Sequence, residues 1–351
     1  MHNAAPAFAH TAGPKDAKIA IVGEAWGEQE ALIGKPFQGY SGQELTRMLQ
    51  ESGIARRDCF LTNVLALRPP NNDLSALCCK KADCGEDYSH PHLGKVGQYL
   101  RPEYLSELER LKNELEIVRP NITIALGATA CWALLGTNGL GSLRGTVATG
   151  TLAGGKVIPT YHPSAVLRNW ANRPITLADL MKAKRESAFP EIKRPSRRIL
   201  VNPTIAECHD WIATHIKNES ACDIETKYGM IEMVGFSADA ENAMVVPFWD
   251  RAKGGNYWGS ATLEKDARNV VRSILENPFV TKIFQNGLYD LQYLMKEGYR
   301  PRSCLEDTML YHHALYPEMQ KGLGFLGSIY TSEPAWKTMR GKKITEMKKD
   351  D

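Results

Sequence analysis

The chain has 351 residues, of which 43% are apolar and 24% are charged, and its formal net charge is +3. These values are ordinary for a soluble globular protein, and a chain of this length typically forms two domains. No apolar run reaches the roughly 18 residues that a membrane-spanning helix needs, so we expect no membrane partner. Eight unevenly spaced cysteines favour a reducing, cytoplasmic location over a disulfide framework.

Residues 1–16 lack the features of a secretory signal and are expected to form a flexible leader. Apolar runs then alternate with helical patterns over residues 17–187. The predicted strands lie within 17–28, 59–67, 121–127 and 155–164, and the predicted helices at 41–53, 103–118, 128–136 and 175–187. This alternation predicts a three-layer α/β/α domain with a mostly parallel sheet. Ligands of such sheets bind beyond the carboxyl ends of the strands, where "GEAWG", "TN" and "YHPS" lie.

Residues 188–203 form the predicted linker, because prolines and basic residues are frequent there. We interpret the linker as a solvated tether, and a DNA-contacting strap is the alternative. In residues 204–351, the segments "SACDIET", "MIEMVGFSA" and "AMVVPFW" predict three consecutive strands. A strand and two helices follow in "TKIFQNGLYDLQYLMKEG" and "DTMLYHHALYP". This order predicts a second α/β domain with a mixed sheet.

Four segments of the first domain carry motifs that belong together. They are "GEAWGEQEALIGKPFQGYSG" (23–42), "TNVLALRPP" (62–70), "IALGATA" (124–130) and "PTYHPSAVLRN" (159–169). In order, spacing and surroundings these segments closely resemble the uracil-DNA glycosylase superfamily, especially its family 4. The resemblance implies a DNA repair enzyme that excises uracil from DNA by hydrolysis of the N-glycosidic bond.

The resemblance assigns catalysis to Glu24 and His162. When the N-glycosidic bond breaks, positive charge develops on the sugar and negative charge on the departing base. A carboxylate can stabilise the cation or orient the attacking water, and a histidine can donate to a base oxygen. Phe37 would stack on the extruded base, and the amide of Asn63 would read its edge. The other implied substrate-binding residues are Gly23, Ala25, Trp26, Gly27, Ser164 and Arg168.

Trp26 departs from the family, which usually has proline at this position. An indole suits two roles, packing beneath the 71–100 insert or forming a pocket wall that alters which base fits. The segment "HPSAVLRN" offers Val166 and Leu167 as an apolar wedge into the duplex, with Arg168 near a phosphate.

Family 4 enzymes typically carry a four-cysteine iron–sulfur cluster, with a Cys-x-x-Cys motif near the start of the chain. No cysteine precedes Cys59 here, so we predict no iron–sulfur cluster at the family position. The spacing of the cysteines in the insert is not a standard zinc pattern. Incidental thiols are favoured there, and zinc is the alternative for the group Cys78, Cys79, Cys84, His90 and His92.

The second domain carries a second set of motifs. Asp223 and Glu225 are two residues apart in "CDIETKYG", so a strand places both carboxylates on one face. "FQNGLYDLQYL" adds Asn286 and Asp290. Over residues 197–335 the chain resembles the DEDD 3′–5′ exonucleases, such as the ribonuclease H-like proofreading domain of family A DNA polymerases. The resemblance implies Mg²⁺ or Mn²⁺ bound by Asp223, Glu225 and Asp290.

The fourth acid of that family is missing from the end of this chain. The final segment "SEPAWKTMRGKKITEMKKDD" has no tyrosine or histidine four residues before an aspartate. Asp307 fits a helix cap better than a metal ligand. We therefore expect the exonuclease-like domain to be incomplete, either through truncation or through loss of the motif.

The fusion of the two domains indicates a protein of viral or mobile-element origin that works in the host cytoplasm. In this interpretation a uracil-DNA glycosylase is joined to an exonuclease-like domain whose metal site a partner DNA polymerase could complete. The alternative is a glycosylase-fold recognition module, or a glycosylase for a modified base, that serves a metal-dependent exonuclease in viral DNA replication.

Overall fold

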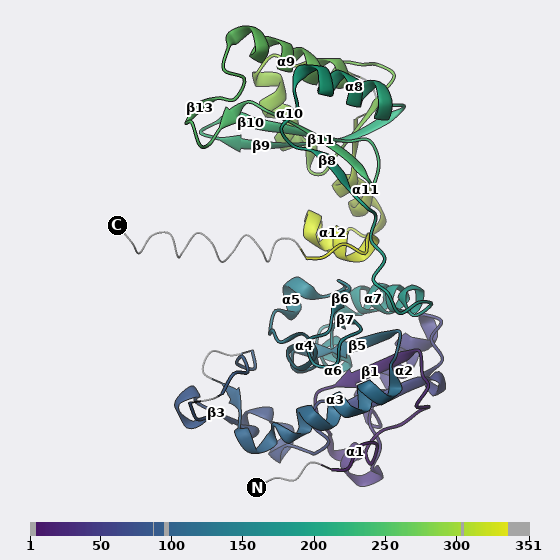
Figure 1. Cartoon of the computed structure of the whole chain (residues 1–351). Helices are drawn as coiled ribbons and strands as arrows, with labels where there is room; N and C mark the ends of the chain where they lie inside the picture. The colour runs from purple at the N-terminus through teal and green to yellow at the C-terminus, as the bar shows by residue number, and fades with distance from the viewer. Residues whose placement is uncertain (1–4, 87, 95–97, 303–304, 336–351) are drawn as a thin grey trace. The chain divides into compact units, whose positions relative to one another are not determined.

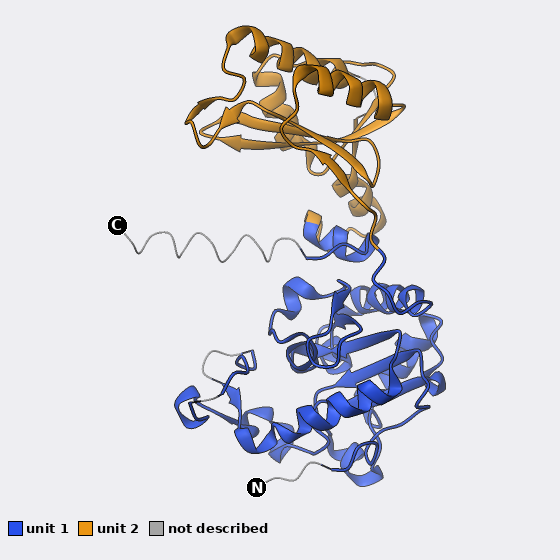
Figure 2. Cartoon of the chain, in the orientation of Figure 1, with its two compact units in different colours: residues 1–193, 324–351 blue, residues 194–323 orange. Residues whose placement is uncertain are grey.

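The computed structural model describes residues 5–86, 88–94, 98–302 and 305–335. The chain divides into two compact units, one formed by residues 1–193 and 324–351 and the other by residues 194–323 (Figures 1 and 2). The boundary between residues 193 and 194 falls inside the predicted linker. In the described part of the chain no helix is both long enough and apolar enough to cross a membrane.

The first unit is built on a five-stranded sheet with the order β2-β1-β5-β7-β6. The first four strands in this order pair in parallel, and β6 pairs antiparallel with β7. The strands are β1 (Ile19–Gly23), β2 (Cys59–Asn63), β5 (Ile122–Leu126), β7 (Lys156–Thr160) and β6 (Ala148–Thr149). Every residue of the four parallel strands is buried, as expected for a parallel sheet covered on both faces.

Helices cover both faces of this sheet (Figure 1). Leu111 of α3 and Trp132 of α4 pack with Val22 on one face, and Leu45 of α2 and Leu180 of α7 pack on the other. The helices of the unit are α1 (Glu28–Ile33), α2 (Tyr40–Glu51), α3 (Ser106–Val118), α4 (Gly127–Leu135), α5 (Leu140–Leu143), α6 (Pro163–Arg168), α7 (Asn172–Glu186) and α12 (Leu323–Tyr330). The predicted three-layer α/β domain with a mostly parallel sheet is confirmed. A short hairpin in the insert pairs β3 (Cys78–Cys79) with β4 (Tyr99–Leu100).

The structure differs from the prediction of a flexible leader at residues 5–16. The Phe8 ring lies edge-on to Phe60, with 5.8 Å between the ring centroids. Ala12 and Leu61 exchange backbone hydrogen bonds of 3.0 and 2.8 Å. The segment is ordered because it buries an aromatic ring and satisfies backbone groups of the edge strand β2, which would otherwise stay unpaired.

The second unit is built on a six-stranded mixed sheet with the order β15-β14-β9-β10-β11-β8. Strands β9, β10 and β11 form the predicted antiparallel meander, while β14, β15 and β8 add parallel pairs. The strands are β8 (Arg198–Leu200), β9 (Glu219–Lys227), β10 (Met230–Ser237), β11 (Asn242–Pro247), β14 (Thr281–Phe284) and β15 (Leu305–Asp307), with a small hairpin of β12 (Trp249–Asp250) and β13 (Gly255–Asn256). The predicted mixed sheet is therefore present.

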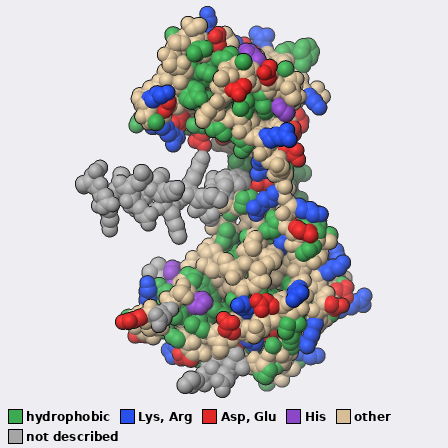
Figure 3. All heavy atoms as spheres, viewed as in Figure 1, with side chains coloured by type: hydrophobic (Ala, Val, Ile, Leu, Met, Phe, Trp, Pro, Cys, Tyr) green, Lys and Arg blue, Asp and Glu red, His purple; other side chains and the backbone are tan. Residues whose placement is uncertain are grey.

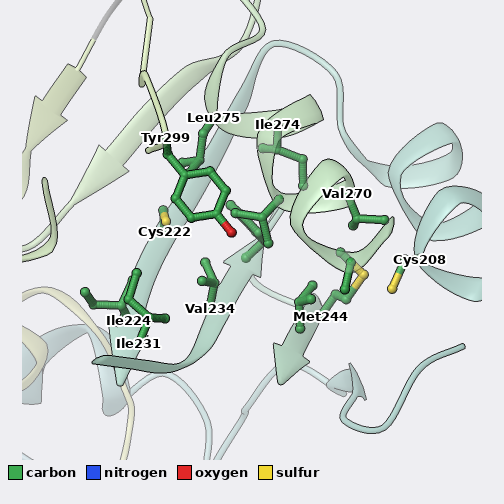
Figure 4. Close-up of a cluster of buried hydrophobic side chains, with 14 of the residues drawn as sticks. Cys208, Cys222, Ile224, Ile231, Val234, Met244, Val270, Ile274, Leu275 and Tyr299 are labelled. Atoms are coloured by element: carbon green, nitrogen blue, oxygen red, sulfur yellow. The ribbon is translucent and has the colours of Figure 1, made fainter. Parts of the chain in front are cut away.

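Four helices accompany this sheet, namely α8 (Ile205–His215), α9 (Ala261–Leu275), α10 (Gly287–Lys296) and α11 (Thr308–Leu315). In the core, Val234 and Met244 of the sheet meet Val270 and Ile274 of α9 (Figure 4). The burial of these side chains provides the main driving force for folding of the unit.

The structure also differs from the sequence analysis at the last described helix. The segment containing α12 was expected in the second domain, but residues 324–335 belong to the first unit. The physical reason is a buried polar contact between Ser328 and the side chains of Arg144 and Lys182.

Candidate active site

A cavity of about 570 Å³ lies at the carboxyl ends of the parallel strands in the first unit. The loops that follow β1, β2 and β7 line it, together with the first turn of α4. The lining includes every first-domain residue predicted for the site except Gly23, namely Glu24, Ala25, Trp26, Gly27, Phe37, Asn63, His162, Ser164 and Arg168. The structure therefore brings residues from four separate segments into one cavity, at the edge that a parallel sheet favours for ligands.

Gly23 lies directly behind the lining residues. A Cβ atom at this position would lie 2.2 Å from Oδ1 of Asn63 and 2.8 Å from Cζ of Phe37. Only glycine leaves space for both side chains at the end of β1. The first glycine of "GEAWG" thus sets how closely the amide and the aromatic ring approach the sheet.

The loops after β1 and β2 are joined by backbone hydrogen bonds. Val64 donates its N–H to the carbonyl of Gly23 at 2.9 Å, and Leu65 donates to the carbonyl of Glu24 at 3.0 Å. β2 ends at Asn63, short of its predicted end, and the bond from Leu65 holds the loop that follows it against the loop after β1.

The carboxylate of Glu24 is half-buried and is oriented by a neighbour that the sequence analysis missed. Thr129 donates its hydroxyl proton to Oε2 of Glu24 across 2.5 Å. Thr129 is buried in the first turn of α4. Thr129 lies within the motif "IALGATA", and this motif was the signal in the sequence that could have identified it.

His162 caps α6, and its ring is held in one orientation. Nδ1 accepts the backbone N–H of Ser164 at 3.2 Å and lies 2.8 Å from the hydroxyl oxygen of the same residue. Because Nδ1 accepts, the neutral ring carries its proton on Nε2. Burial lowers the pKa of His162 to about 4, and the positive charge of Arg168 adds to the shift. The imidazole is therefore neutral at pH 7, with an N–H available to donate from Nε2.

Asn63 is 3% exposed and places a polar amide in the wall of the cavity. In the described part of the chain its Nδ2 atom has no hydrogen-bond partner. A buried donor without a partner is costly, and native structures contain few of them. This unpaired N–H therefore indicates a ligand with a hydrogen-bond acceptor.

A buried ionic network supports the turn that carries Asn63. Arg110 of α3 donates from Nη2 to the backbone carbonyls of Asn63 and Val64 at 2.7 and 3.0 Å. Its guanidinium also pairs with Glu107 at 2.9 Å and with Glu114 at 2.8 Å. The sequence pattern predicted this helix but gave no reason to expect its charged residues in the interior.

Phe37 lies in a backbone conformation that is uncommon for an aromatic residue, with φ at +57°. Arg56 holds this turn by donating from Nη2 to the Phe37 carbonyl at 2.9 Å. A Cβ atom at Gly42 would lie 1.9 Å from the same carbonyl oxygen. The neighbouring residues therefore hold this strained turn in place, and the ring of Phe37 lines the cavity.

Trp26 lines the cavity and is 8% exposed. Its ring packs edge-on against His10, with 4.5 Å between the ring centroids. Within the described residues its indole N–H has no hydrogen-bond partner. Asn72 of the insert lines the same cavity, so both roles predicted for Trp26 stay predictions.

The two wedge candidates on α6 differ in exposure. Val166 is fully buried in the core, so the prediction that it enters a DNA duplex is wrong. Leu167 is 46% exposed and remains available for that role. Arg168 is exposed and lines the cavity.

In the second unit, Asp223 and Glu225 lie on the face of β9 opposite the buried residues Cys222 and Ile224. Oδ1 of Asp290 accepts the backbone N–H of Ile224 at 3.0 Å. Burial raises the pKa of Asp290 to about 6, and the charge of Asp223 adds to this effect.

Asp307 caps α11 by accepting the backbone N–H of Met309 at 2.8 Å, as the sequence predicts. The structure groups no three metal-ligating side chains among the residues it describes, so it does not assemble the predicted metal site of Asp223, Glu225 and Asp290.

The described cysteines do not fit a four-thiolate iron–sulfur cluster. The sulfur atoms of Cys79 and Cys84 lie 2.6 Å apart, but the Cys78 thiol donates to the carbonyl of Leu74 at 3.4 Å. His92 contacts Asn138 rather than the cysteines. The described portion of the insert thus places two thiols together, without the third and fourth ligands of a cluster or a structural zinc site.

Comparison with known proteins identifies the family of the first unit. The family model for the uracil DNA glycosylase superfamily matches residues 10–193. The type-4 uracil-DNA glycosylase of Thermotoga maritima is 38% identical over 176 residues, which cover 49% of this chain and 79% of that protein. The type-4 enzyme of Saccharolobus solfataricus is 34% identical over 180 residues, which cover 49% and 72% of the two chains.

Among solved structures, Brucella melitensis NrnC matches 38% of this chain at 18% identity, with a TM-score of 0.28. The match covers 59% of NrnC, which is less than two thirds of its length. A similarity this low does not identify the fold of either unit.

Proposed function

This chain belongs to the uracil-DNA glycosylase superfamily, and we propose that its first unit excises uracil from DNA by hydrolysing the N-glycosidic bond. The observation that carries the proposal is the cavity at the carboxyl end of the sheet. It gathers a carboxylate, a neutral imidazole, an unpaired buried amide and an aromatic ring from separate loops. These are the groups that hydrolysis of a nucleoside bond requires.

In the proposed mechanism the extruded base first binds between Phe37 and Asn63. The ring of Phe37 provides a stacking surface, and the unpaired Nδ2 of Asn63 donates to a carbonyl oxygen of the base. Gly23 allows both side chains to occupy these positions. Uracil suits this arrangement because it carries carbonyl acceptors on a flat ring.

Cleavage then separates charge between the sugar and the base. The bond between C1′ and the base nitrogen breaks, and its electron pair leaves with the base. Nε2–H of His162 donates to the base oxygen on which negative charge accumulates. Glu24 stabilises the cationic sugar and accepts a proton from the water whose oxygen bonds to C1′. The products are an abasic sugar and the free base.

Contacts with the DNA backbone are expected to be local rather than spread over a basic face. The net charge is +3, and positive and negative side chains are interspersed over the visible surface (Figure 3). Arg168, which lines the cavity, would bind a phosphate, and the exposed Leu167 would fill the space that the extruded base leaves.

A second candidate substrate is a modified base. Trp26, the position at which the chain departs from the family pattern, lines the cavity, and its buried indole N–H has no partner among the described residues. A base with an additional acceptor group could pair with this donor. In the non-catalytic alternative, the first unit is a recognition module that binds the modified base without cleaving its N-glycosidic bond.

For the second unit we propose 3′–5′ exonuclease-like action on DNA with Mg²⁺ or Mn²⁺. The observation that favours it is the common face of Asp223 and Glu225 on β9, with Asp290 hydrogen-bonded to the residue between them. Metal binding would have to draw these three carboxylates together for two-metal hydrolysis of a phosphodiester. In this proposal residues outside the given sequence, or a partner such as a DNA polymerase, complete the metal site.

The test of the proposed function uses a labelled oligonucleotide that contains one uracil. The full chain is incubated with it, and alkali then cleaves any abasic site. We expect a single cut at the uracil, and a loss of at least 100-fold in rate for Glu24→Gln and for His162→Ala. A folded wild-type chain that leaves uracil intact in both single- and double-stranded DNA would disprove the proposal.

A further inference from the structure

Helix α12 follows the second unit in the sequence but packs within the first unit. Ser328 of this helix is 5% exposed. Its hydroxyl oxygen accepts a hydrogen bond from Nη2 of Arg144, and its carbonyl accepts one from Nζ of Lys182 at 2.7 Å. One residue of α12 thus satisfies two buried cations of the first unit.

Each cation also has a hydrogen-bond acceptor elsewhere in the first unit. Arg144 is 4% exposed, and its Nη1 donates to Asp179 at 2.6 Å. Lys182 is 2% exposed, and its Nζ also donates to the carbonyl of Gly145 at 2.6 Å. If α12 were absent, each of the two buried cations would lose a hydrogen-bond acceptor. Buried charges without full pairing are strongly destabilising.

Two further contacts join α12 to the loop that contains Arg144. The ring of Phe325 lies under the Arg144 guanidinium, with 4.8 Å between its centroid and Cζ. Gly145 has a φ of +70°, and a Cβ atom there would lie 2.5 Å from Asp179 and 3.1 Å from the carbonyl of Ser328. The loop is therefore enclosed between α7 and α12, with no space for a side chain at Gly145.

This loop reaches the proposed active site. The backbone N–H of Arg144 donates to the carbonyl of Leu140 at 2.8 Å and ends the short helix α5. Leu140 lines the same cavity as Glu24 and His162. A helix of four residues has little intrinsic stability, so its position depends on the contacts of Arg144.

We propose that α12 is a positioning element for this cavity, acting through Ser328 and Arg144 on the loop that carries Leu140. The second unit is then an insertion into the first rather than a domain appended to it. A first unit that ended at residue 193 would lack the contacts by which α12 holds the loop that carries Leu140. The claim about the loop stands on the contacts alone, while its effect on base excision rests on the proposed function.

The experiment compares two lysine substitutions on the same helix in the full chain. Ser328→Lys places a third cation beside Arg144 and Lys182, whereas Leu323→Lys adds the same charge at a position that is 44% exposed. Hydrogen–deuterium exchange of the amides of residues 140–146 is measured, with exchange in β1 and β5 as the internal reference. We expect exchange in 140–146 to accelerate at least tenfold in Ser328→Lys and less than twofold in Leu323→Lys.

If Ser328→Lys also accelerates exchange in the reference strands, the unit has unfolded, and Ser328→Ala replaces it. Ser328→Ala removes the hydroxyl oxygen that accepts the hydrogen bond from Arg144. We expect about threefold faster exchange of the amides of residues 140–146 and unchanged exchange in β1 and β5. Equal protection of 140–146 in wild type and in both Ser328 variants would overturn the proposal.

Uracil excision is the second measurement. In Ser328→Ala we expect KM for the oligonucleotide to rise several-fold with little change in kcat, because Leu140 contributes to binding and takes no part in proton transfer. A wild type that excises nothing would reject the proposed function and leave the exchange test of α12 intact. A Ser328→Ala variant with altered exchange and unaltered KM would restrict α12 to a structural role and overturn its link to the cavity.

Discussion

The hydrogen bond between Thr129 and Glu24 gives a prediction whose size can be worked out. Thr129→Val keeps the volume of the side chain but removes the hydroxyl that donates to Oε2 across 2.5 Å. A hydrogen bond to a charged group contributes about 1.5–3 kcal/mol. If that energy orients the carboxylate for the transition state, kcat should fall by roughly 10- to 100-fold. KM should change little, because Thr129 is not itself among the residues that line the cavity.

The assay is single-turnover excision from a uracil-containing oligonucleotide by the wild type and four full-length variants. Thr129→Ser restores the hydroxyl and should recover most of the rate. Glu24→Gln should excise uracil slowly. Adding Thr129→Val to this variant should lower the excision rate by less than a further threefold, because the two residues act as one unit. Equal rates for Thr129→Val and wild type, or full additivity in the double variant, would refute the claim that Thr129 acts through Glu24.

Three further outcomes follow from the same geometry. Gly23→Ala should destabilise the first unit by about 1–3 kcal/mol and slow excision at least tenfold, because the added Cβ atom would lie 2.2 Å from Oδ1 of Asn63. Thermal melting and excision rates measure the two effects. Gly141→Ala is the control, since Gly141 has open space around it, and it should change neither quantity. His162 has a pKa of about 4 when folded and near 6.5 when unfolded, so the unfolded state binds more protons between these values. Stability should therefore fall as the pH drops through this window, by about 2–3 kcal/mol between pH 7 and pH 4, and His162→Gln should remove that part of the slope in pH-dependent denaturation. A chelator should leave uracil excision unchanged, because Glu24 and His162 carry the proposed chemistry, but should abolish any shortening of 3′ ends seen on a gel with Mn²⁺.

Much of the first unit could be predicted from sequence because its strands are short apolar runs that end in distinctive polar loops. Parallel strands deliver their carboxyl ends to one edge, so motifs far apart in sequence were expected to meet. The cavity contains Glu24, Asn63 and His162 for this reason. The meander of the second unit was predictable from the sequence too, because apolar Cys222 and Ile224 alternate with charged Asp223 and Glu225 along β9.

The missed features depend on partners that lie far away in sequence. Thr129 resembles an ordinary helix residue until Glu24 is placed beside it, 105 positions away. Arg110 lies on a helix rich in charge, which usually indicates a solvated face, yet it is 4% exposed because two glutamates and two carbonyls surround it. Ser328 is 184 positions from Arg144, and no local pattern reports that contact.

Excision of uracil by this chain is established or excluded by identifying the small molecule released from uracil-containing DNA. The full chain is incubated with the oligonucleotide in the presence of a chelator, and the low-molecular-mass fraction is analysed by mass spectrometry. We expect free uracil together with a full-length strand that carries one abasic site, and no release by Glu24→Gln. Release of deoxyuridine monophosphate in place of uracil, or no release by the folded wild-type chain, would contradict this expectation.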